Sequence, residues 1–496
     1  MLLSSLLKNM EFSLVKGNLD VEIANVTSDS REVANNGLFV AIPGFVVDGH
    51  SFINKAIDKG ATAVIVDRDI TISNDITVIR VNNCRLALAS VSAQFYGEPT
   101  KNLHLVGITG TNGKTSTSYF LKSIFEEANK AIGVIGTMGT IMGDKVLQNK
   151  NTTPESSEVQ KLMKSMIDEG IDQCVMEVSS HALELNRVAE CNFNIGIFTN
   201  LTPDHLELHK SMEEYFLAKA KLFDLTNDYN IINMDDEYGA KLIKMVEGQT
   251  TKLITFGLSE QADFYPSDIQ YEFDHTRFIL NTPEGKKHIK VNLPGEIYVY
   301  NSLAAIASAY CSGIDLETIR KGIDKVDGIK GRMEVIYKRG DYSVIVDFSH
   351  TEDALEKALT TIRPYVKGKL ILVFGVYADA SPNGKKKREG MAKVASQFAD
   401  FSIVTSDNPK NYDPYLIIRE ISEAMVRNNG NYKAILNREE AIQYAVEVSE
   451  ENDIILIAGK GHETSQIIGG KEIPFNETEI VMEALKSRMK VAGAFR

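Results

Sequence analysis

The sequence predicts an α/β fold with three domains. The chain has 496 residues, and at roughly 150 residues per domain this length predicts about three domains. Short runs rich in β-branched residues alternate with amphipathic helical stretches, which is typical of parallel sheets. The alternation restarts after the Gly- and Pro-containing segment GEPTKN and again near GRMEVI. We therefore predict domains at residues 1–100, 101–333 and 334–496.

The first domain is expected to alternate strands and helices. LFVAIPG and AVIVD are predicted strands, and FINKAIDKG is a predicted helix between them. The N-terminal MLLSSLLKNMEF is too short, and too interrupted by Lys8, Asn9 and Glu11, for a signal peptide, so an amphipathic helix is expected. Since no run of 18 apolar residues occurs, no transmembrane helix is expected.

The second and third domains repeat this pattern. The second begins with the strand LHLVGITG and the helix TSTSYFLKSIFEEANK, and AIGVIGT, CVMEVSS, NIGIFTN and NIINMDD are further strands of a parallel sheet. KLITFG, DIQYEF, TRFILN and KHIKVNL are added strands for which an antiparallel arrangement is considered, and NSLAAIASAYCSG is a helix. The third domain contains the strands YSVIVDFS, KLILVFG, FSIVTSD, KAILN and DIILIAGK. The dense basic run GKKKREG at 384–390 has a solvated loop as its simplest interpretation.

Charge and cysteine content narrow the class of function. The formal net charge is −13, which argues against binding to nucleic acid or to an anionic membrane. The four cysteines, Cys84, Cys174, Cys191 and Cys311, are far apart, and no close Cys-Cys or Cys-His spacing suggests a zinc site. Idle thiols in a reducing compartment are therefore expected, and we predict a cytoplasmic protein.

The glycine-rich turn GITGTNGKTST, residues 107–117, is the sharpest functional feature. It misses the strict P-loop pattern by one residue. A buried strand nevertheless ends in glycines, Lys114 can bridge outer phosphates, the Thr115 hydroxyl can bind Mg²⁺, and the next helix directs its positive end at the anion. The alternative is a glycine-rich turn with a surface lysine. We predict a P-loop at the start of the central domain.

Several motifs in order along the chain give a family resemblance. They are GTNGKTS (110–116), NTTPE (151–155), MEVSSHAL (176–183), TNLTPDHLELH (199–209), YFLAKAKLF (215–223), NMDDEYG (233–239), GRMEVI (331–336), VDFSHTEDAL (346–355), SDNPK (406–410) and GKGHETSQIIGG (459–470). Together they resemble the Mur ligase family, which also includes folylpolyglutamate synthetases. DSREVANNGLFVAIPGFVVDGHSFI (29–53) resembles the family's UDP-binding domain. The motifs are most similar to those of members that add the third residue to UDP-N-acetylmuramoyl-L-alanyl-D-glutamate. The resemblance implies a central P-loop ATPase domain and a Rossmann-like C-terminal domain.

The resemblance implies roles for the residues around the P-loop. ATP and Mg²⁺ are the implied cofactors, with catalytic roles for Lys114, Glu177, His205 and Lys219. Thr115, Glu177, His205 and Lys219 would hold or orient the metal, and Lys219 would be carbamylated. Without the resemblance, Glu177 would be a salt-bridge partner, His205 a helix-cap partner and Lys219 a surface lysine. The loop residues expected to bind the nucleotide are Gly110, Thr111, Asn112, Gly113, Lys114, Thr115 and Ser116.

The remaining implied contacts fall into three groups. Asn301, Arg332 and Asp347 would also contact ATP. Ser30, Asn151, Thr152, Thr153, Ser179 and Arg187 would bind the nucleotide-sugar substrate. Asp407, Asn408, Lys410, Gly459 and Glu463 would bind the amino-acid acceptor.

Departures from the family pattern concentrate at the substrate ends. Relatives that add diaminopimelate carry two arginines suited to carboxylates, where this chain has Ala380 and Lys410. Their absence argues against diaminopimelate, and a cation at Lys410 also fits a lysine acceptor poorly unless it pairs with Asp413. The acceptor therefore stays open. Further departures are Leu185, Pro203, Phe348, Ser349, Glu352 and Ser465, which replace other residues of the family motifs.

The predicted function is an ATP-dependent amide-bond ligase of peptidoglycan precursor synthesis. It would activate a carboxylate of UDP-N-acetylmuramoyl-L-alanyl-D-glutamate as an acyl phosphate and join it to an amino acid. The alternatives are a Mur-like paralogue with a different carboxylate and amine, or a non-catalytic nucleotide-binding regulator. The expected partners are the UDP-linked muramoyl peptide and an amino acid, with no nucleic acid and no membrane, and the chain is expected to be a monomer.

Overall fold

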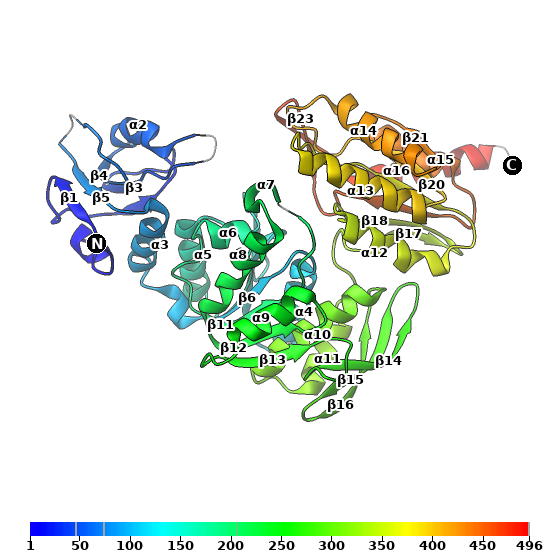
Figure 1. Cartoon of the computed structure of the whole chain (residues 1–496), viewed down its shortest axis with the longest axis horizontal. Helices are drawn as coiled ribbons and strands as arrows, with labels where there is room; N and C mark the ends of the chain where they lie inside the picture. The colour runs from blue at the N-terminus through cyan, green and yellow to red at the C-terminus, as the bar shows by residue number, and fades with distance from the viewer. Residues whose placement is uncertain (45–46, 73–74, 205, 495–496) are drawn as a thin grey trace. The chain divides into compact units, whose positions relative to one another are not determined.

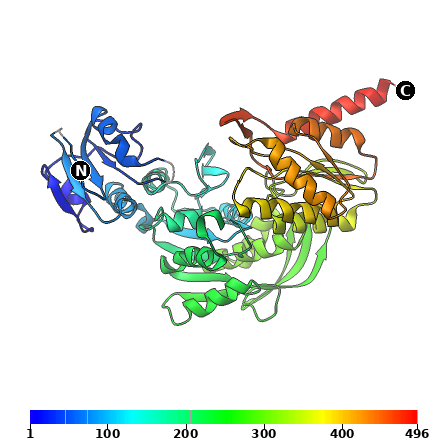
Figure 2. The ribbon, with the colours of Figure 1, turned by 45° about the horizontal axis from the view of Figure 1, so that its top comes forward.

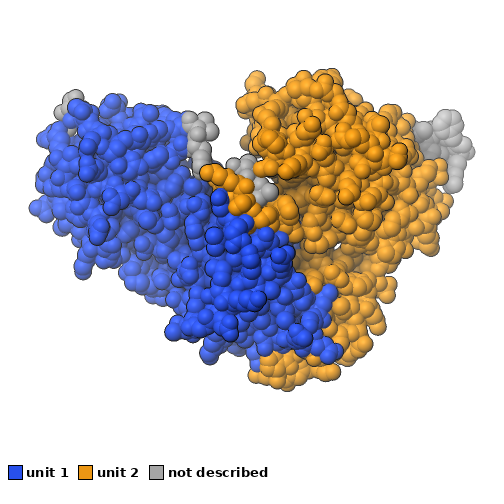
Figure 3. Space-filling model, in the orientation of Figure 1, with its two compact units in different colours: residues 1–201, 213–264, 303–322 blue, residues 202–212, 265–302, 323–496 orange. Residues whose placement is uncertain are grey.

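The fold was examined in a computed structural model that describes residues 1–44, 47–72, 75–204 and 206–494. The chain divides into two compact units, coloured separately in Figure 3. Unit 1 contains residues 1–201, 213–264 and 303–322, and unit 2 contains residues 202–212, 265–302 and 323–496. Among the described residues, no helix combines the length and apolar character that a membrane crossing requires.

The N-terminal part of unit 1 is built on a five-stranded sheet in the order β1-β5-β4-β3-β2. Four of its strands are parallel, and β1 pairs antiparallel with β5 at one edge. The strands are β1 (Ser13–Lys16), β2 (Asn25–Thr27), β3 (Gly37–Val40), β4 (Ala61–Val66) and β5 (Thr77–Arg80). The helices are α1 (Leu3–Leu6), η1 (Gly49–Phe52), α2 (Ile53–Asp58), α3 (Cys84–Phe95) and η2 (Pro99–Asn102).

Alternating side chains of this sheet form two cores. Leu38 and Val40 of β3 pack with α1 and α3, whereas the intervening Phe39 packs with α2 on the other face. Successive residues of a strand point to opposite faces, so a strand that is apolar throughout must be covered on both sides. The predicted α/β character of this segment is confirmed, and the predicted N-terminal helix is limited to α1.

The central part of unit 1 is an eight-stranded sheet in the order β13-β12-β11-β6-β10-β7-β8-β9. It is parallel from β13 to β7, and β8 and β9 continue it as antiparallel strands. Figure 1 labels four of its strands, β6, β11, β12 and β13. The strands are β6 (His104–Thr109), β7 (Ile132–Gly136), β8 (Gly139–Met142), β9 (Lys145–Leu147), β10 (Gln173–Glu177), β11 (Phe193–Phe198), β12 (Thr226–Asn233) and β13 (Lys252–Phe256). The helices are α4 (Lys114–Glu127), α5 (Ser156–Asp168), α6 (Ser180–Glu184), α7 (Leu206–His209), α8 (Met212–Asp224) and α9 (Glu237–Val246).

The added strands after residue 250 divide between two sheets. KLITFG forms β13, which is parallel to β12, so an antiparallel arrangement is wrong for this strand. The next three strands form the separate antiparallel sheet β14-β15-β16, as considered from the sequence. They are β14 (Tyr265–Tyr271), β15 (Thr276–Thr282) and β16 (Gly285–Val291), followed by the helices α10 (Glu296–Cys311) and α11 (Leu316–Asp324).

The C-terminal part of unit 2 contains a six-stranded sheet in the order β17-β18-β22-β19-β20-β21. All its neighbouring strands are parallel except β17, which pairs antiparallel with β18 at one edge. Figure 2 shows the last hundred residues of the chain in orange and red. The strands are β17 (Glu334–Arg339), β18 (Tyr342–Asp347), β19 (Leu370–Phe374), β20 (Phe401–Val404), β21 (Tyr432–Ala434) and β22 (Ile454–Ala458), with a hairpin of β23 (Ser465–Ile468) and β24 (Lys471–Pro474). The helices are α12 (Glu352–Ile362), η3 (Arg363–Tyr365), α13 (Pro382–Phe398), α14 (Pro414–Arg427), α15 (Arg438–Val448) and α16 (Glu477–Ala494).

The basic run at 384–390 lies within α13 and is not a loop. Pro382 occupies the first turn of this helix, and the Ser381 side chain accepts a hydrogen bond from the Gly384 N–H. Arg388 is 4% exposed and packs into unit 2. The high charge of the run had suggested a solvated loop, but the run forms part of a helix with one buried face.

Candidate active site

The glycine-rich turn connects the end of β6 to the start of α4. Gly110 has φ +144°, and a Cβ atom there would lie 1.9 Å from the Thr199 hydroxyl, so only glycine fits. The Thr199 hydroxyl donates to the Asn112 carbonyl at 2.7 Å, and the Asn112 N–H donates to the Asn200 side chain at 2.9 Å. The segment after β11 therefore holds the turn in shape.

Lys114 is the first residue of the 14-residue helix α4. Its Nζ donates to the Gly110 carbonyl at 2.8 Å and to the Thr111 carbonyl at 2.9 Å. The ammonium group therefore lies over the turn, at the end of α4 where backbone N–H groups favour anions. Ser116 lies in the first turn of the same helix. This arrangement fits the phosphates of a nucleotide.

Glu177 ends the neighbouring strand β10 and is 1% exposed. Its carboxylate accepts hydrogen bonds from the Thr115 hydroxyl at 3.0 Å, the Thr137 hydroxyl at 3.0 Å and the Thr137 N–H at 3.2 Å. Within the described part of the chain, no ion pair of Glu177 with a cationic side chain is present, so the salt-bridge interpretation is not supported. A buried charge without a counter-charge is costly. The residues present therefore fit a bound Mg²⁺, a hard cation that prefers oxygen ligands.

Lys219 of α8 is 2% exposed, which excludes the surface-lysine interpretation. Its Nζ donates to the Gly110 carbonyl at 2.8 Å and lies 4.6 Å from the centre of the Tyr215 ring. The Tyr215 hydroxyl is in turn 3.2 Å from the Thr111 hydroxyl. Lys219 therefore lies against the P-loop, and its carbamylation stays a prediction. His205, the other predicted metal contact, lies outside the described residues.

The residues predicted to bind the nucleotide sugar surround Glu177. The Thr153 hydroxyl donates to the Glu177 carbonyl at 2.8 Å and accepts from the Ser179 N–H at 3.1 Å. The Thr152 hydroxyl is 3.2 Å from that of Thr137, and Arg187 Nη1 donates to the Thr153 carbonyl at 3.0 Å. Four of the six predicted residues are thus contiguous with the Glu177 site.

Ser30 and Asn151 belong to segments that approach each other within unit 1. Lys150 Nζ lies 3.9 Å from the Asp29 carboxylate and 3.9 Å from that of Glu32. Ser30 is 7% exposed, whereas Asn151 is exposed. Their predicted contact with the nucleotide sugar stays a prediction.

The other predicted nucleotide contacts belong to unit 2. Asp347 ends β18, and its carboxylate accepts from the Met333 N–H at 2.7 Å, from the Ser349 N–H at 2.9 Å and from the Ser349 hydroxyl. Burial raises the pKa of the Asp347 carboxyl, although these hydrogen bonds act in the opposite direction. The Arg332 guanidinium lies 4.5 Å from the Phe348 ring centre. Asn301 lies on α10 and is 2% exposed.

The predicted acceptor residues come together at the carboxyl end of the C-terminal sheet. Asn408 donates to the Glu463 carboxylate at 3.1 Å. Lys460 Nζ donates to the same carboxylate at 2.6 Å and to the Asn408 side-chain oxygen at 3.2 Å. Gly459 has φ +122°, and a Cβ atom there would lie 2.8 Å from the Asp407 carboxylate. These side chains suit an amino acid: the Asp407 and Glu463 carboxylates could bind its ammonium group, and the Lys460 ammonium could bind a carboxylate.

Lys410 is directed at an aromatic ring. Its Nζ lies 5.6 Å from the Tyr377 ring centre, and Lys387 Nζ lies 4.4 Å from the same centre. Lys387 also forms an ion pair with Asp204 at 3.2 Å. Asp413 instead caps α14 by accepting from the Tyr415 N–H at 2.9 Å, so the suggested Lys410–Asp413 pair is wrong. Two lysine side chains therefore lie beside Tyr377, and one of them, Lys387, is paired with Asp204.

Sequence reasoning missed Thr137, Lys387, Lys460 and Tyr377. The signal for Thr137 was its position at the end of the predicted strand AIGVIGT; in the structure it directly follows β7. Lys460 lies inside the GKGHE stretch between two predicted residues. Lys387 lay in the basic run, and Tyr377 gave no signal of its own.

A P-loop turn before a helix, with a buried carboxylate at the end of the adjacent parallel strand, defines a nucleotide-binding α/β enzyme. Three family models match the chain: Mur ligase family, catalytic domain, at residues 22–96; Mur ligase middle domain at residues 108–309; and Mur ligase, glutamate ligase domain, at residues 331–461. The chain belongs to the Mur ligase family and is an ATP-dependent, ADP-forming ligase. The predicted three-domain α/β fold is confirmed, whereas the predicted boundaries stay predictions.

Relatives match along nearly the whole chain. A protein of Clostridium perfringens named UDP-N-acetylmuramoyl-L-alanyl-D-glutamate–2,6-diaminopimelate ligase is 43% identical over 98% of this chain and 100% of its own length. A solved structure of a ligase with the same name has a TM-score of 0.70 at 28% identity, covering 99% of both chains. A MurF ligase from Thermotoga maritima in complex with ADP has a TM-score of 0.64 at 17% identity, covering 95% of this chain and 99% of its own, and shows the fold alone.

Proposed function

We propose that this chain joins an amino acid to UDP-N-acetylmuramoyl-L-alanyl-D-glutamate through an acyl phosphate, at the expense of ATP. The observation that carries the proposal is the contact between two sets of residues in unit 1. The Thr115 and Thr137 hydroxyls bind the buried Glu177 carboxylate, and Thr152, Thr153 and Ser179 lie directly beside them. The groups predicted to bind phosphate and those predicted to bind the substrate are thus adjacent.

The residues of the P-loop act on the first step. A substrate carboxylate oxygen attacks the γ-phosphorus of ATP, and ADP leaves with the electrons of the broken P–O bond. Both reactants are anionic, so the Lys114 ammonium and the N-terminus of α4 offset their repulsion. Mg²⁺, when bound at Thr115 and Glu177, supplies further positive charge for the transferring phosphoryl group.

The acceptor residues act on the second step. The amine nitrogen attacks the acyl carbon, inorganic phosphate leaves, and the amine loses its proton as the amide forms. The Glu463 carboxylate is suited to bind the acceptor's ammonium, and Asn408 and Lys460 hold that carboxylate in place. Positioning of the amine against the acyl carbon is the main contribution expected of this pocket.

The pair of ammonium groups at Tyr377 favours an acceptor whose side chain carries a carboxylate, such as 2,6-diaminopimelate, over lysine. The absence of two arginines argued against diaminopimelate because it removed the cations. Lys410 brings a cation to this position beside Lys387, whose own charge is paired with Asp204, and Lys410 would repel a cationic lysine side chain. The names of the relatives agree with a diaminopimelate acceptor.

We expect Lys410→Ala to lower kcat/KM for diaminopimelate by roughly 10–100-fold, because a charge-assisted hydrogen bond contributes about 1.5–3 kcal/mol. Phosphate release with ATP, Mg²⁺, the UDP-muramoyl dipeptide and each of several amino acids is the measurement. The matched control is Lys433→Ala, which removes another lysine that lies over a tyrosine ring, Tyr444, elsewhere in the same domain. A preference of the wild-type enzyme for lysine would refute the acceptor, and no release with any amino acid would refute the proposed reaction.

We expect Lys219→Ala to lower turnover by roughly 10–100-fold, the range for groups that orient metal ligands. If Lys219 acts as a carbamate, short carboxylic acids should partly restore activity, because they can occupy the space left beside the Gly110 carbonyl. Lys221→Ala is the control, since Lys221 lies on the same helix and pairs with Glu184 at the surface. Loss of activity without rescue would argue that Lys219 acts as an ammonium.

A further inference from the structure

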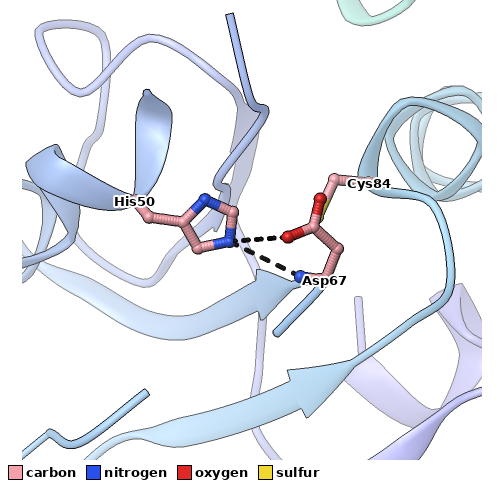
Figure 4. Close-up of side chains that lie close together, drawn as sticks. All are labelled: His50, Asp67 and Cys84. Carbon is pink, nitrogen blue, oxygen red and sulfur yellow. Dashed lines mark hydrogen bonds and ion pairs between the residues drawn. The ribbon is translucent and has the colours of Figure 1, made fainter. Parts of the chain in front are cut away.

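Three potential metal ligands converge in the N-terminal sheet domain, and the proposed ligase reaction uses none of them. His50 lies in η1, Asp67 directly follows β4, and Cys84 is the first residue of α3. One ligand atom of each residue lies within 4.8 Å of the others. Figure 4 shows the His50 ring directed at the Asp67 carboxylate, with Cys84 beside it. Sequence spacing did not reveal the group because its three members, His50, Asp67 and Cys84, are far apart along the chain.

Both ring nitrogens of His50 have polar partners. Nδ1 lies 2.7 Å from the Asp48 carboxylate, and Nε2 lies 3.5 Å from the Asp67 N–H. With the proton on Nδ1, the Nε2 lone pair faces the Asp67 carboxylate oxygen at 3.3 Å. Two acceptors at this distance repel each other unless a proton or a cation lies between them. A bound metal would require this tautomer, which carboxylate–histidine–metal arrangements use; the contact of the Arg68 guanidinium, a donor, with Nδ1 at 2.9 Å favours the other one.

The distance between His50 and Asp67 suits a small tetrahedral site. For metal–ligand bonds of about 2.0–2.1 Å, the edge between a nitrogen and an oxygen ligand is roughly 3.3 Å. The His50–Asp67 distance of 3.3 Å already has this value. Cys84 supplies a buried sulfur at the N-terminus of the 12-residue helix α3.

Burial raises the pKa of the Cys84 thiol to about 12, and the nearby Asp67 acts in the same direction. Without a cation the thiol therefore keeps its proton, and its Sγ faces the Ile65 carbonyl at 3.9 Å. Binding of a borderline-soft divalent cation releases this proton, because only the thiolate is a metal ligand.

We propose that the N-terminal domain binds one Zn²⁺-class divalent cation through His50 Nε2, the Asp67 carboxylate and Cys84 Sγ, with Asp48 orienting the imidazole. A mixed N, O and S ligand set selects zinc-like ions over Mg²⁺. The cation would join η1, the end of β4 and the start of α3, and so brace the domain that contains Ser30. The competing occupant is a proton, since an imidazolium between Asp48 and Asp67 satisfies the same hydrogen bonds. Arg68, 2.9 Å from Nδ1, adds positive charge on the outer side.

The test uses the full-length protein with Zn²⁺ and with Co²⁺ as probes, at saturating Mg²⁺. Equilibrium dialysis followed by elemental analysis should find one Zn²⁺ per chain that Mg²⁺ does not displace. Co²⁺ should give a sulfur-to-metal charge-transfer absorption, which the oxygen ligands of the P-loop site cannot produce. Both signals should disappear in Cys84→Ser and His50→Gln and persist in Cys191→Ser, which alters another buried thiol. Asp48→Asn should weaken Zn²⁺ binding by roughly 10–100-fold.

Phosphate release by Cys84→Ser should stay at the wild-type level, because Cys84 takes no part in the proposed ligase reaction. If Cys84→Ser unfolds, His50→Gln provides the same comparison. Equal Zn²⁺ stoichiometry in all variants, or Co²⁺ binding without the sulfur absorption, would overturn the proposal and assign the position to a proton.

Discussion

Lys114→Ala is expected to lower ATP-dependent phosphate release by roughly 10²–10³-fold, the cost of removing one preorganised donor from a charged transition state. Lys114 Nζ lies over the turn and binds the Gly110 and Thr111 carbonyls. In the reaction it would bridge phosphate oxygens at the start of α4. Steady-state phosphate release measures turnover, and calorimetry measures nucleotide affinity. The two together separate a slower reaction from weaker ATP binding.

The same helix offers a matched control for this variant. Lys122 also lies on α4 and forms an exposed pair with Glu126 at 2.6 Å. Since exposed pairs contribute little, Lys122→Ala should keep both turnover and nucleotide affinity. Unchanged turnover in Lys114→Ala, with the thermal midpoint intact, would remove the basis of the proposed function.

Glu177→Gln is expected to lower turnover by roughly 10²–10³-fold, because a metal ligand contributes several kcal/mol to charge stabilisation in the transition state. The Mg²⁺ concentration needed for half-maximal activity should rise. The thermal stability of Glu177→Gln, in contrast to its activity, should not fall. Because the buried carboxylate lacks an ion-pair partner among the described residues, neutralising it should leave the thermal midpoint unchanged or raise it.

Glu169→Gln is the control for the removed charge. Glu169 directly follows α5 in the same unit and pairs with Lys145 at the surface at 2.7 Å. This variant should alter neither turnover nor Mg²⁺ dependence. A Glu177→Gln enzyme that kept its Mg²⁺ dependence would show that Glu177 has a structural role only, as a hydrogen-bond acceptor for Thr115 and Thr137.

The P-loop could be predicted from the sequence because its parts are contiguous. The strand, the two glycines, Lys114 and Thr115 lie within one short segment, and local geometry alone places them at the helix N-terminus. Glu177 could be predicted as a candidate because it ends a strand of a parallel sheet, where carboxyl ends meet at one edge. Its pairing with Thr137 depended on strand order, since β10 lies between β6 and β7.

The sequence pattern did not predict the surroundings of Lys410 at the proposed acceptor site. Asp413 was the nearest acidic partner in sequence for Lys410, but it caps α14 and is directed at the backbone N–H of Tyr415. Lys410 has φ +54°, a backbone turn that no sequence rule predicted. Tyr377 and Lys387 reach it from the loop after β19 and from α13. Which charged side chains meet at Tyr377 therefore depends on the directions in which they point, and spacing along the chain does not encode those directions.

The sequence by itself determined the α/β class, the family and the identity of the nucleotide loop, since each depends on short contiguous patterns of hydrophobicity, glycine and charge. Only the tertiary structure decided which distant side chains meet: Thr137 with Glu177, Lys387 and Lys410 at Tyr377, and His50 with Asp67 and Cys84. The physical reason is that local propensity acts over a few residues, whereas proximity between separate strands and helices is set by strand order, register and the packing of the two faces of each sheet.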